Sequence, residues 1–256
     1  KILEMKIQEK LIQDFEIKYF QNKPLTGKPI LLIHGLTSGW EEWMKIIKIL
    51  GKTKSLIAVD LPGHGHSDRL KEYTISNYSQ PLLGLTEQLS NQPFDIIRHS
   101  LGGLISIFVA NKLNNKVRKL VIEDPPIFLR NQKQSPIIDL LNKEAIEKLN
   151  WKTISYSEYY IKTIHSHISE NKLKIKAKHS FFTDINAYNF SNFSGNISLE
   201  MLLKNNKSKT LLTHGAQNRE AYYQKKTQIN WLNLSLNVQL EVGRTQVMLF
   251  TRSTLK

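Results

Sequence analysis

The chain has 256 residues, which suits one α/β domain with an insertion and suffices for a hydrophobic core of its own. It contains no cysteine, which excludes disulfides and thiolate metal sites and fits a reducing compartment. No apolar run reaches the ~20 residues that cross a bilayer, and the N-terminus lacks the apolar centre of a signal peptide. We therefore expect a soluble, cytoplasmic protein with no membrane span.

The formal net charge is +14, carried by lysines along the whole chain and denser at 172–178 and 204–209. Such a field attracts nucleic acid without sequence preference. No nucleic-acid-binding motif or interleaving of aromatic and basic residues accompanies the lysines. A solvated lysine-rich surface with no specific nucleic-acid partner is expected.

The N-terminal third predicts alternating strands and helices. Residues 14–20 alternate polar and apolar side chains, as in a half-buried antiparallel edge strand. Residues 30–33 form an uninterrupted apolar run, typical of a central parallel strand buried on both faces. Residues 40–50 carry an apolar stripe at helical spacing, and 55–60 read as the next strand.

The stretch 94–106 organises the chain. A short apolar run, a serine among small residues and an apolar segment at helical spacing predict strand, tight turn and helix, with Ser100 at the apex. This is the pattern of a nucleophile elbow, in which the hydroxyl projects from the sheet. The usual motif is Gly-x-Ser-x-Gly, but Arg98 takes the leading position and should crowd the strand–helix crossing.

After the elbow, residues 117–123 read as a strand, and the alternation predicts right-handed crossovers in a doubly wound sheet. From 127 to about 207 the alternation stops, and polar helical patterns with many aromatics follow. Residues 210–214 and 237–242 read as the last two strands, joined by a helix at 222–234. The remaining residues can form only a short helical stub at 249–256.

Four stretches carry a resemblance: the elbow, Leu31 to Leu36, Asp60 to Asp68, and Val121 to Pro126. In this order and spacing the chain resembles the α/β-hydrolase superfamily, in the branch of lidded esterases, lipases and C–C hydrolases. The resemblance implies an α/β-hydrolase fold: a mostly parallel, doubly wound sheet with a helical lid inserted after strand 6. Residues 1–126 and 208–256 would form the core and 127–207 the lid, whose aromatics roof an apolar pocket or pack on one another.

The resemblance also implies site residues. Ser100 would be the nucleophile, and the backbone N–H groups of Leu36 and Leu101 would form the oxyanion hole, binding a small apolar ester-like ligand without cofactor or metal. His34 is expected to be structural. His64 and His66 could line the pocket, but solvated loop residues are the favoured interpretation. His99 should point away from the serine hydroxyl.

Acyl transfer by a serine needs a histidine base and an acid that orients it. At the positions where the family carries these two groups, this chain has Gln246 in place of the base and Asn218 in place of the acid. Neither amide titrates near neutral pH. Glu123 and Asp124 stand where some relatives keep their acid, but no histidine follows His214.

The lid histidines are remote alternatives as bases; they are His165, His167 and His179. The sequence thus favours a protein descended from a serine hydrolase of carboxylic esters or related acyl substrates, now weak or inactive. The alternative is a non-catalytic ligand-binding or scaffold protein, a pseudoenzyme that uses the lid pocket. A basic surface protein that holds nucleic acid ranks third.

Overall fold

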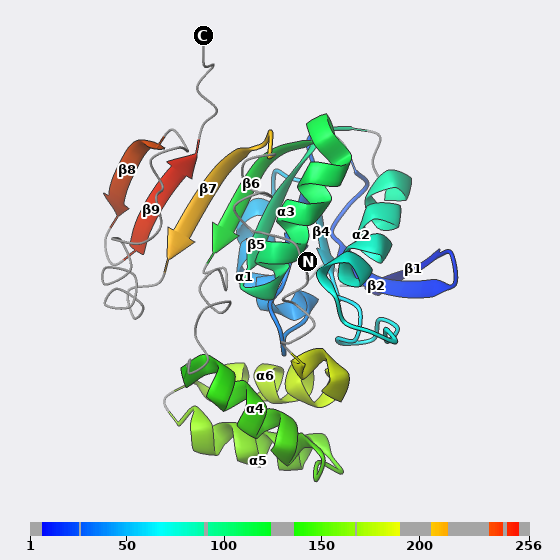
Figure 1. Ribbon diagram of the computed structural model, residues 1–256, viewed down its shortest axis with the longest axis vertical. Helices are drawn as coiled ribbons and strands as arrows, with labels where there is room; N and C mark the ends of the chain where they lie inside the picture. Colours follow the sequence, from blue (N-terminus) through cyan, green and yellow to red (C-terminus); the bar gives the residue numbers. More distant parts are fainter. Residues whose placement is uncertain are drawn as a thin grey trace.

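The computed structural model describes residues 7–25, 27–89, 92–123, 136–166, 168–189, 206–214, 236–242 and 245–250. Within these ranges, helices flank both faces of a nine-stranded sheet, and a group of three helices lies beyond one end of its strands (Figure 1). The strand order is β1-β2-β4-β3-β5-β6-β7-β9-β8.

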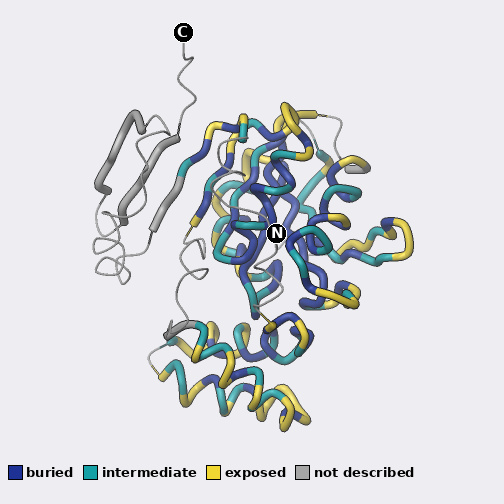
Figure 2. Tube along the Cα trace, viewed as in Figure 1, coloured by how far each residue is buried: buried dark blue, intermediate teal, exposed yellow. Residues whose placement is uncertain are grey.

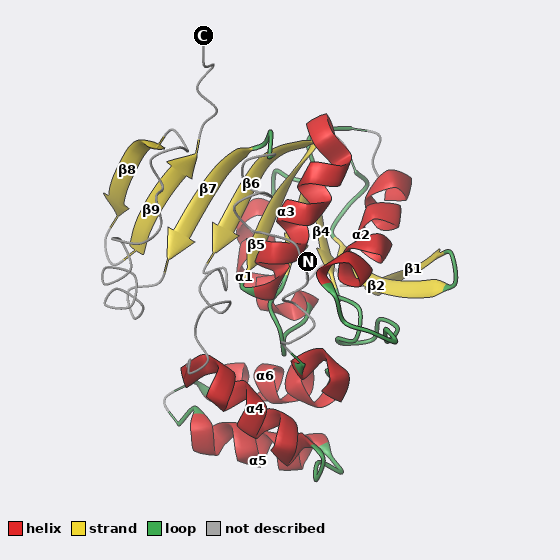
Figure 3. Cartoon of the chain, viewed as in Figure 1, coloured by secondary structure: helices red, strands yellow, loops and turns green. Residues whose placement is uncertain are grey.

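The strands are β1 (Ile7–Ile12), β2 (Phe15–Gln21), β3 (Ile30–Ile33), β4 (Leu56–Val59), β5 (Phe94–His99), β6 (Val117–Glu123), β7 (Lys209–His214), β8 (Leu236–Val242) and β9 (Thr245–Phe250). The helices are α1 (Met44–Leu50), α2 (Ile75–Leu89), α3 (Leu101–Leu113), α4 (Pro136–Lys148), α5 (Ile154–Ile164) and α6 (Glu170–Phe182). Among the residues that the structure describes there are three short 3₁₀ turns: η1 (Trp40–Trp43), η2 (Asn114–Lys116) and η4 (Ile185–Tyr188). Figure 3 shows how helices and strands separate into layers.

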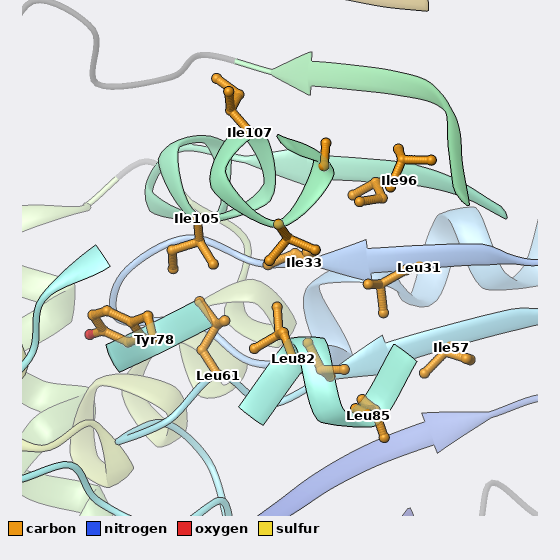
Figure 4. Close-up of a cluster of buried hydrophobic side chains, with 14 of the residues drawn as sticks. Leu31, Ile33, Ile57, Leu61, Tyr78, Leu82, Leu85, Ile96, Ile105 and Ile107 are labelled. Carbon is orange, nitrogen blue, oxygen red and sulfur yellow. The ribbon is translucent and has the colours of Figure 1, made fainter. Parts of the chain in front are cut away.

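The core lies on both faces of the central strands. Because side chains alternate along a strand, Leu31 and Ile33 of β3 enter the cluster under α2 and α3 (Figure 4), whereas Leu32 enters the cluster under η1 and α1. In the second cluster Phe20 stacks on Trp40 with 5.0 Å between ring centroids. Figure 2 shows the buried residues concentrated in this central part of the sheet. The predicted doubly wound arrangement is confirmed.

The parallel part of the sheet consists of β4, β3, β5, β6 and β7. The strand expected at 14–20 is present as β2 and is antiparallel to β4, but it is not the edge. That expectation was wrong because β1 pairs with β2 along its whole length. The mostly exposed side chains of β1 give its sequence no alternating apolar signal.

The C-terminal end of the sheet also differs from expectation. The strand expected at 237–242 is present as β8, but β9 lies between it and β7, antiparallel to both. Leu249 and Phe250, expected to begin a helical stub, belong to β9, whose apolar run continues the backbone ladder from β7. The helix expected at 222–234 lies outside the described residues.

Helices α4, α5 and α6 and turn η4 form a separate group, here called the cap (136–189), opposite the carboxyl ends of the parallel strands (Figure 1). The cap has its own apolar cluster, with Trp151, Ile161 and Leu173 at its centre. Trp151 and Tyr160 pack ring against ring inside it at 5.8 Å. These aromatics therefore stabilise the cap itself.

Candidate active site

Ser100 lies at a sharp corner between β5 and α3. Its backbone has φ 47° and ψ −118°, a region that residues other than glycine rarely occupy. The Ser100 N–H donates to the carbonyl oxygen of Glu123 at 2.9 Å, and the Gly103 N–H donates to the Ser100 carbonyl at 2.7 Å. The corner is thus held on its strand side by β6 and on its helix side by the first turn of α3.

Two glycines let the backbone segments of the corner approach closely. A Cβ atom on Gly102 would lie 2.7 Å from the carbonyl oxygens of both Ile33 and His34, which is closer than real Cβ contacts allow. A Cβ atom on Gly35 would lie 3.0 Å from the Ser100 Cβ. The end of β3 therefore packs directly on the elbow, so the backbones of Leu36 and Leu101 belong to adjoining segments.

His34 is a structural residue. It is fully buried, its Nδ1 lies 2.6 Å from the Gly35 carbonyl oxygen, and its Nε2 accepts the Leu61 N–H at 2.9 Å. Because Nε2 accepts, Nδ1 carries the proton and the ring is neutral. Burial holds the pKa of His34 well below its ordinary value. The expected structural role agrees with these contacts.

His64 does not lie in solvent, as the sequence led us to expect. It is fully buried, its Nδ1 lies 3.0 Å from the Pro62 carbonyl oxygen, and its ring meets that of His34 edge-on at 5.1 Å. Burial lowers the pKa of His64 to about 4. The expectation failed because the loop folds inward against α2. His66, in contrast, is exposed, as expected.

His99 turns to the α1 face of the sheet, where its Nδ1 lies 3.2 Å from Glu42 Oε1. Glu42 also accepts a hydrogen bond from Ser38 Oγ at 2.8 Å. Burial alone would raise the pKa of Glu42, but its hydrogen bond with His99 and the nearby imidazole charges lower it to about 2. The pair ties the strand before the nucleophile to the turn at 40–43.

Arg98 turns to the opposite face, under α3. Its side chain is completely buried, and none of its three guanidinium nitrogens has a hydrogen-bond partner in the part of the chain that the structure describes. Its neighbours across the ladder are Ile33 and Ile122, which point to the same apolar face. Desolvation holds the pKa of Arg98 well below its ordinary value. At the position where the sequence motif led us to expect crowding, the structure thus has a buried guanidinium without a hydrogen-bond partner among the described residues.

Within the described residues, no hydrogen bond joins the Ser100 hydroxyl to an imidazole. His34 and His64 are committed to backbone groups, and His99 and His179 to Glu42 and Glu41 respectively. His165 ends α5 as its C-cap, and His167 lies outside the described residues.

Of the remaining predicted site positions, the structure describes Glu123 and the backbone of Gln246. Gln246 is the second residue of β9, and its backbone pairs with His214 at the end of β7. Position 246 is therefore three strand spacings, about 14 Å, from the elbow. Glu123 ends β6 with an exposed side chain. Asp124, Asn218 and the side chain of Gln246 lie outside the described part of the chain.

Comparison with known proteins agrees with this architecture. The sequence model of the alpha/beta hydrolase fold matches residues 28–154, which hold the elbow, the loop after β3 and the loop after β4. The chain belongs to the α/β-hydrolase family. N-formylmaleamic acid deformylase from Pseudomonas putida superimposes with a TM-score of 0.68 at 18% identity, over 82% of each chain. That likeness establishes the fold.

Curated hydrolases are similar to part of the chain. The 2-hydroxy-6-oxo-2,4-heptadienoate hydrolase of Pseudomonas putida is 29% identical over 101 residues, which are 38% of this chain and 37% of that enzyme. Monoacylglycerol lipase ABHD6 of Homo sapiens is 26% identical over 145 residues, 54% of this chain and 43% of that protein. The chain thus spans less than half the length of these relatives.

Two features are absent from the described residues of this hydrolase-family chain. No helix among them is both long and apolar enough to cross a membrane. No group of three or more potential metal-binding side chains occurs among them.

The hydrolase core and the cap meet at Glu41, on the turn at 40–43. Glu41 Oε2 lies 2.8 Å from His179 Nε2, and Lys178 Nζ donates to Glu41 Oε1 at 3.0 Å. The hydrogen bond from His179, followed by the contact with Lys178, lowers the pKa of Glu41 to about 2. Glu41 is therefore ionised at all but the most acidic pH values.

These carboxyls predict how stability depends on pH. Glu41 and Glu42 both have a folded-state pKa of about 2, below the ordinary 4.5. Their contribution is complete above pH ~4.5 and is lost as the pH falls toward 2, because protons then bind the unfolded chain more tightly. Since both side chains are partly exposed, we expect about 2 kcal/mol from each.

Urea unfolding of the wild type and the Glu41→Gln variant at pH 7, 5 and 3 checks this prediction. The variant should be less stable at pH 7 and should lose less stability between pH 5 and pH 3. Equal losses in the two proteins would contradict the assignment of Glu41.

Proposed function

We propose that this protein descends from a serine hydrolase of carboxylic esters or related acyl substrates and that its own turnover is weak or absent. The observation that carries the proposal is the presentation of Ser100 on a strained corner, next to the segments that hold the Leu36 and Leu101 amides. The proposed ligand is a small apolar ester. The lack of cysteine supports a cytoplasmic setting.

The proposed chemistry begins with attack of Ser100 Oγ on the acyl carbon. A carbon–oxygen bond forms, the carbonyl becomes an oxyanion, and the N–H groups of Leu36 and Leu101 are proposed to stabilise it. Such donors contribute about 3–4 kcal/mol each. Breakdown then expels the alcohol and leaves an acyl group on Ser100.

The serine proton has to leave during the attack, and this step limits the proposed activity. The sequence has amides at the two partner positions, Gln246 and Asn218. The imidazoles of His34, His64, His99 and His179 are engaged elsewhere. Glu123 and Asp124 stay candidates for an alternative acid. Without a base the proton passes to water, and oxyanion stabilisation with binding leaves only about 10³–10⁴-fold acceleration over the uncatalysed reaction.

The segment 127–207 is proposed to act as a lid over the carboxyl edge of the sheet, with 1–126 and 208–256 as the core. Support comes from the position of the cap opposite the strand ends (Figure 1). Ligands of open α/β sheets bind at this edge. The same lid would serve the alternative function, in which the protein holds a ligand without turning it over.

Labelling with a fluorophosphonate tests the proposal. We expect slow 1:1 labelling that is absent in Ser100→Ala, together with hydrolysis of a p-nitrophenyl ester far below the kcat of ordinary enzymes, about 1–10³ s⁻¹. A folded wild-type protein that never labels would remove the hydrolase assignment and favour the ligand-binding alternative. Turnover within the ordinary range would contradict the missing base.

A further inference from the structure

The cap contacts the loop after β3 through one face of α6. This loop, residues 36–42, runs from the proposed oxyanion donor Leu36 to Glu42. Lys176 Nζ donates to Thr37 Oγ1 at 3.2 Å, and His179 Nε2 lies 2.8 Å from Glu41 Oε2. Since they are three residues apart, Lys176 and His179 project from the same side of the helix. One helix face thus holds both ends of the loop.

The held loop is buried and strained at Thr37. Thr37 is 4% exposed and has φ 56°, in the left-handed region that a β-branched residue seldom adopts. Such a conformation costs on the order of a few RT and persists only when its surroundings impose it. Among the described residues, Lys176 is the hydrogen-bond partner of the Thr37 side chain. The Leu36 N–H belongs to the peptide between Gly35 and Leu36, and Thr37 is joined to that peptide through the Leu36 backbone. The fixed position of Thr37 therefore restricts the directions that the Leu36 N–H can take.

The middle of the loop is clamped between the core and the cap. The Trp40 N–H donates to Asp60 Oδ1 at 2.9 Å from the core side. A Cβ atom on Gly39 would lie 2.9 Å from both Asp60 Oδ1 and His179 Nε2. Gly39 is therefore packed closely between Asp60 and His179, which limits movement of the loop while His179 stays in place.

A second attachment holds the cap independently of this loop. Tyr73 donates its hydroxyl to Asp184 Oδ2 at 2.7 Å, and the Asp184 N–H donates to the Gly63 carbonyl at 2.7 Å. Both contacts join the loop after β4 to Asp184, the N-cap of turn η4. Loss of the α6 contacts should therefore free loop 36–42 without detaching the cap.

We propose that Lys176 and His179 are positioning residues: by docking on Thr37 and Glu41 they hold the Leu36 amide toward Ser100, so cap docking completes the oxyanion hole. This inference rests on the proposed function, because it assigns the Leu36 amide a role in acyl transfer. It couples a lid helix to the reacting centre although neither side chain needs to touch the substrate.

The test compares Lys176→Met/His179→Leu with two other double variants. Lys172→Met/Lys174→Met is the control, since both lysines are exposed on α6 and Lys174 pairs with Glu170 on the same helix. Lys176→Arg/His179→Gln keeps hydrogen-bond donors at both positions and serves as the rescue. The single variant Lys176→Met replaces the first one if that protein does not fold.

The first readout is hydrogen–deuterium exchange of peptides covering residues 34–42. Exchange should be at least about tenfold faster in Lys176→Met/His179→Leu, unchanged in the control and restored in the rescue, while peptides of α3 and β5 keep their protection. The second readout is fluorophosphonate labelling. Its maximal rate constant should fall about tenfold or more at an unchanged half-saturating concentration, because a misdirected oxyanion donor affects the chemical step.

The outcomes separate this inference from the function on which it rests. Unchanged exchange at 34–42 in a folded variant would overturn the coupling. Faster exchange with an unchanged labelling rate would also overturn it, since the loop would then move without affecting the reaction. If the wild type never labels and the loop exchange still responds, the proposed hydrolase function fails, and so does the catalytic part of the inference.

Discussion

Replacement of Arg98 with methionine is expected to stabilise the protein by about 2–4 kcal/mol. The guanidinium is fully buried and lacks a hydrogen-bond partner within the described residues, so the folded state bears its desolvation cost without compensation. Methionine is unbranched and adaptable, and it fills most of the same volume between Ile33, Ile122 and α3. Urea unfolding at pH 7 measures the difference.

Arg118→Met is the matched control, because Arg118 lies on the neighbouring strand β6 and pairs with Asp95 at a partly exposed position. Removal of this ion pair should lower stability by about 0–1 kcal/mol, the opposite sign. An Arg98→Met protein no more stable than the wild type would show that the guanidinium is compensated in solution.

Replacement of Gly102 with alanine is expected to destabilise the protein by about 3 kcal/mol and to abolish labelling of Ser100. The new methyl group would overlap the carbonyl oxygens of Ile33 and His34, which are backbone atoms and cannot rotate away. Alanine gains about 1 kcal/mol in helix propensity, but overpacking outweighs it. Separation of β3 from α3 would also displace the loop that carries Leu36. Thermal unfolding and fluorophosphonate labelling report the two effects.

Gly27→Ala separates this overlap from the general cost of losing a glycine. A Cβ atom on Gly27 meets nothing within 4 Å, although its φ of 66° favours glycine, so a loss of about 1 kcal/mol is expected. Comparable losses of stability in the two variants would contradict the close approach of β3 and α3 at Gly102.

The elbow was predictable because its signals are local. A serine between an apolar strand and a helix whose second and third residues are glycines fixes the corner within a few residues. The strands β3 and β4 were equally clear, since four consecutive buried apolar residues suit only a central strand. Arg98 was recognised as unusual because it replaces the leading glycine of the motif.

The parts that could not be predicted depend on contacts between distant segments. The burial of His64 comes from its packing against His34, thirty residues earlier in the chain. The pairing of β9 with β7 could not be predicted, because the periodicity of a strand does not indicate which other strand it pairs with. Likewise, Lys176 and Thr37 meet across 139 positions, and a lysine-rich helix gives no sign of which lysine points inward.

The backbone conformation of Ser100 does not depend on the residues that would handle its proton. Its unfavourable φ is imposed by the crossing of β3, β5 and α3, so substitutions at the amide positions 218 and 246 do not relax it. The chain therefore keeps a preformed geometry at Ser100 even when the residue that would accept its proton is replaced. A small diffusible base such as imidazole, supplied from solution, would meet a hydroxyl already aimed at an acyl group.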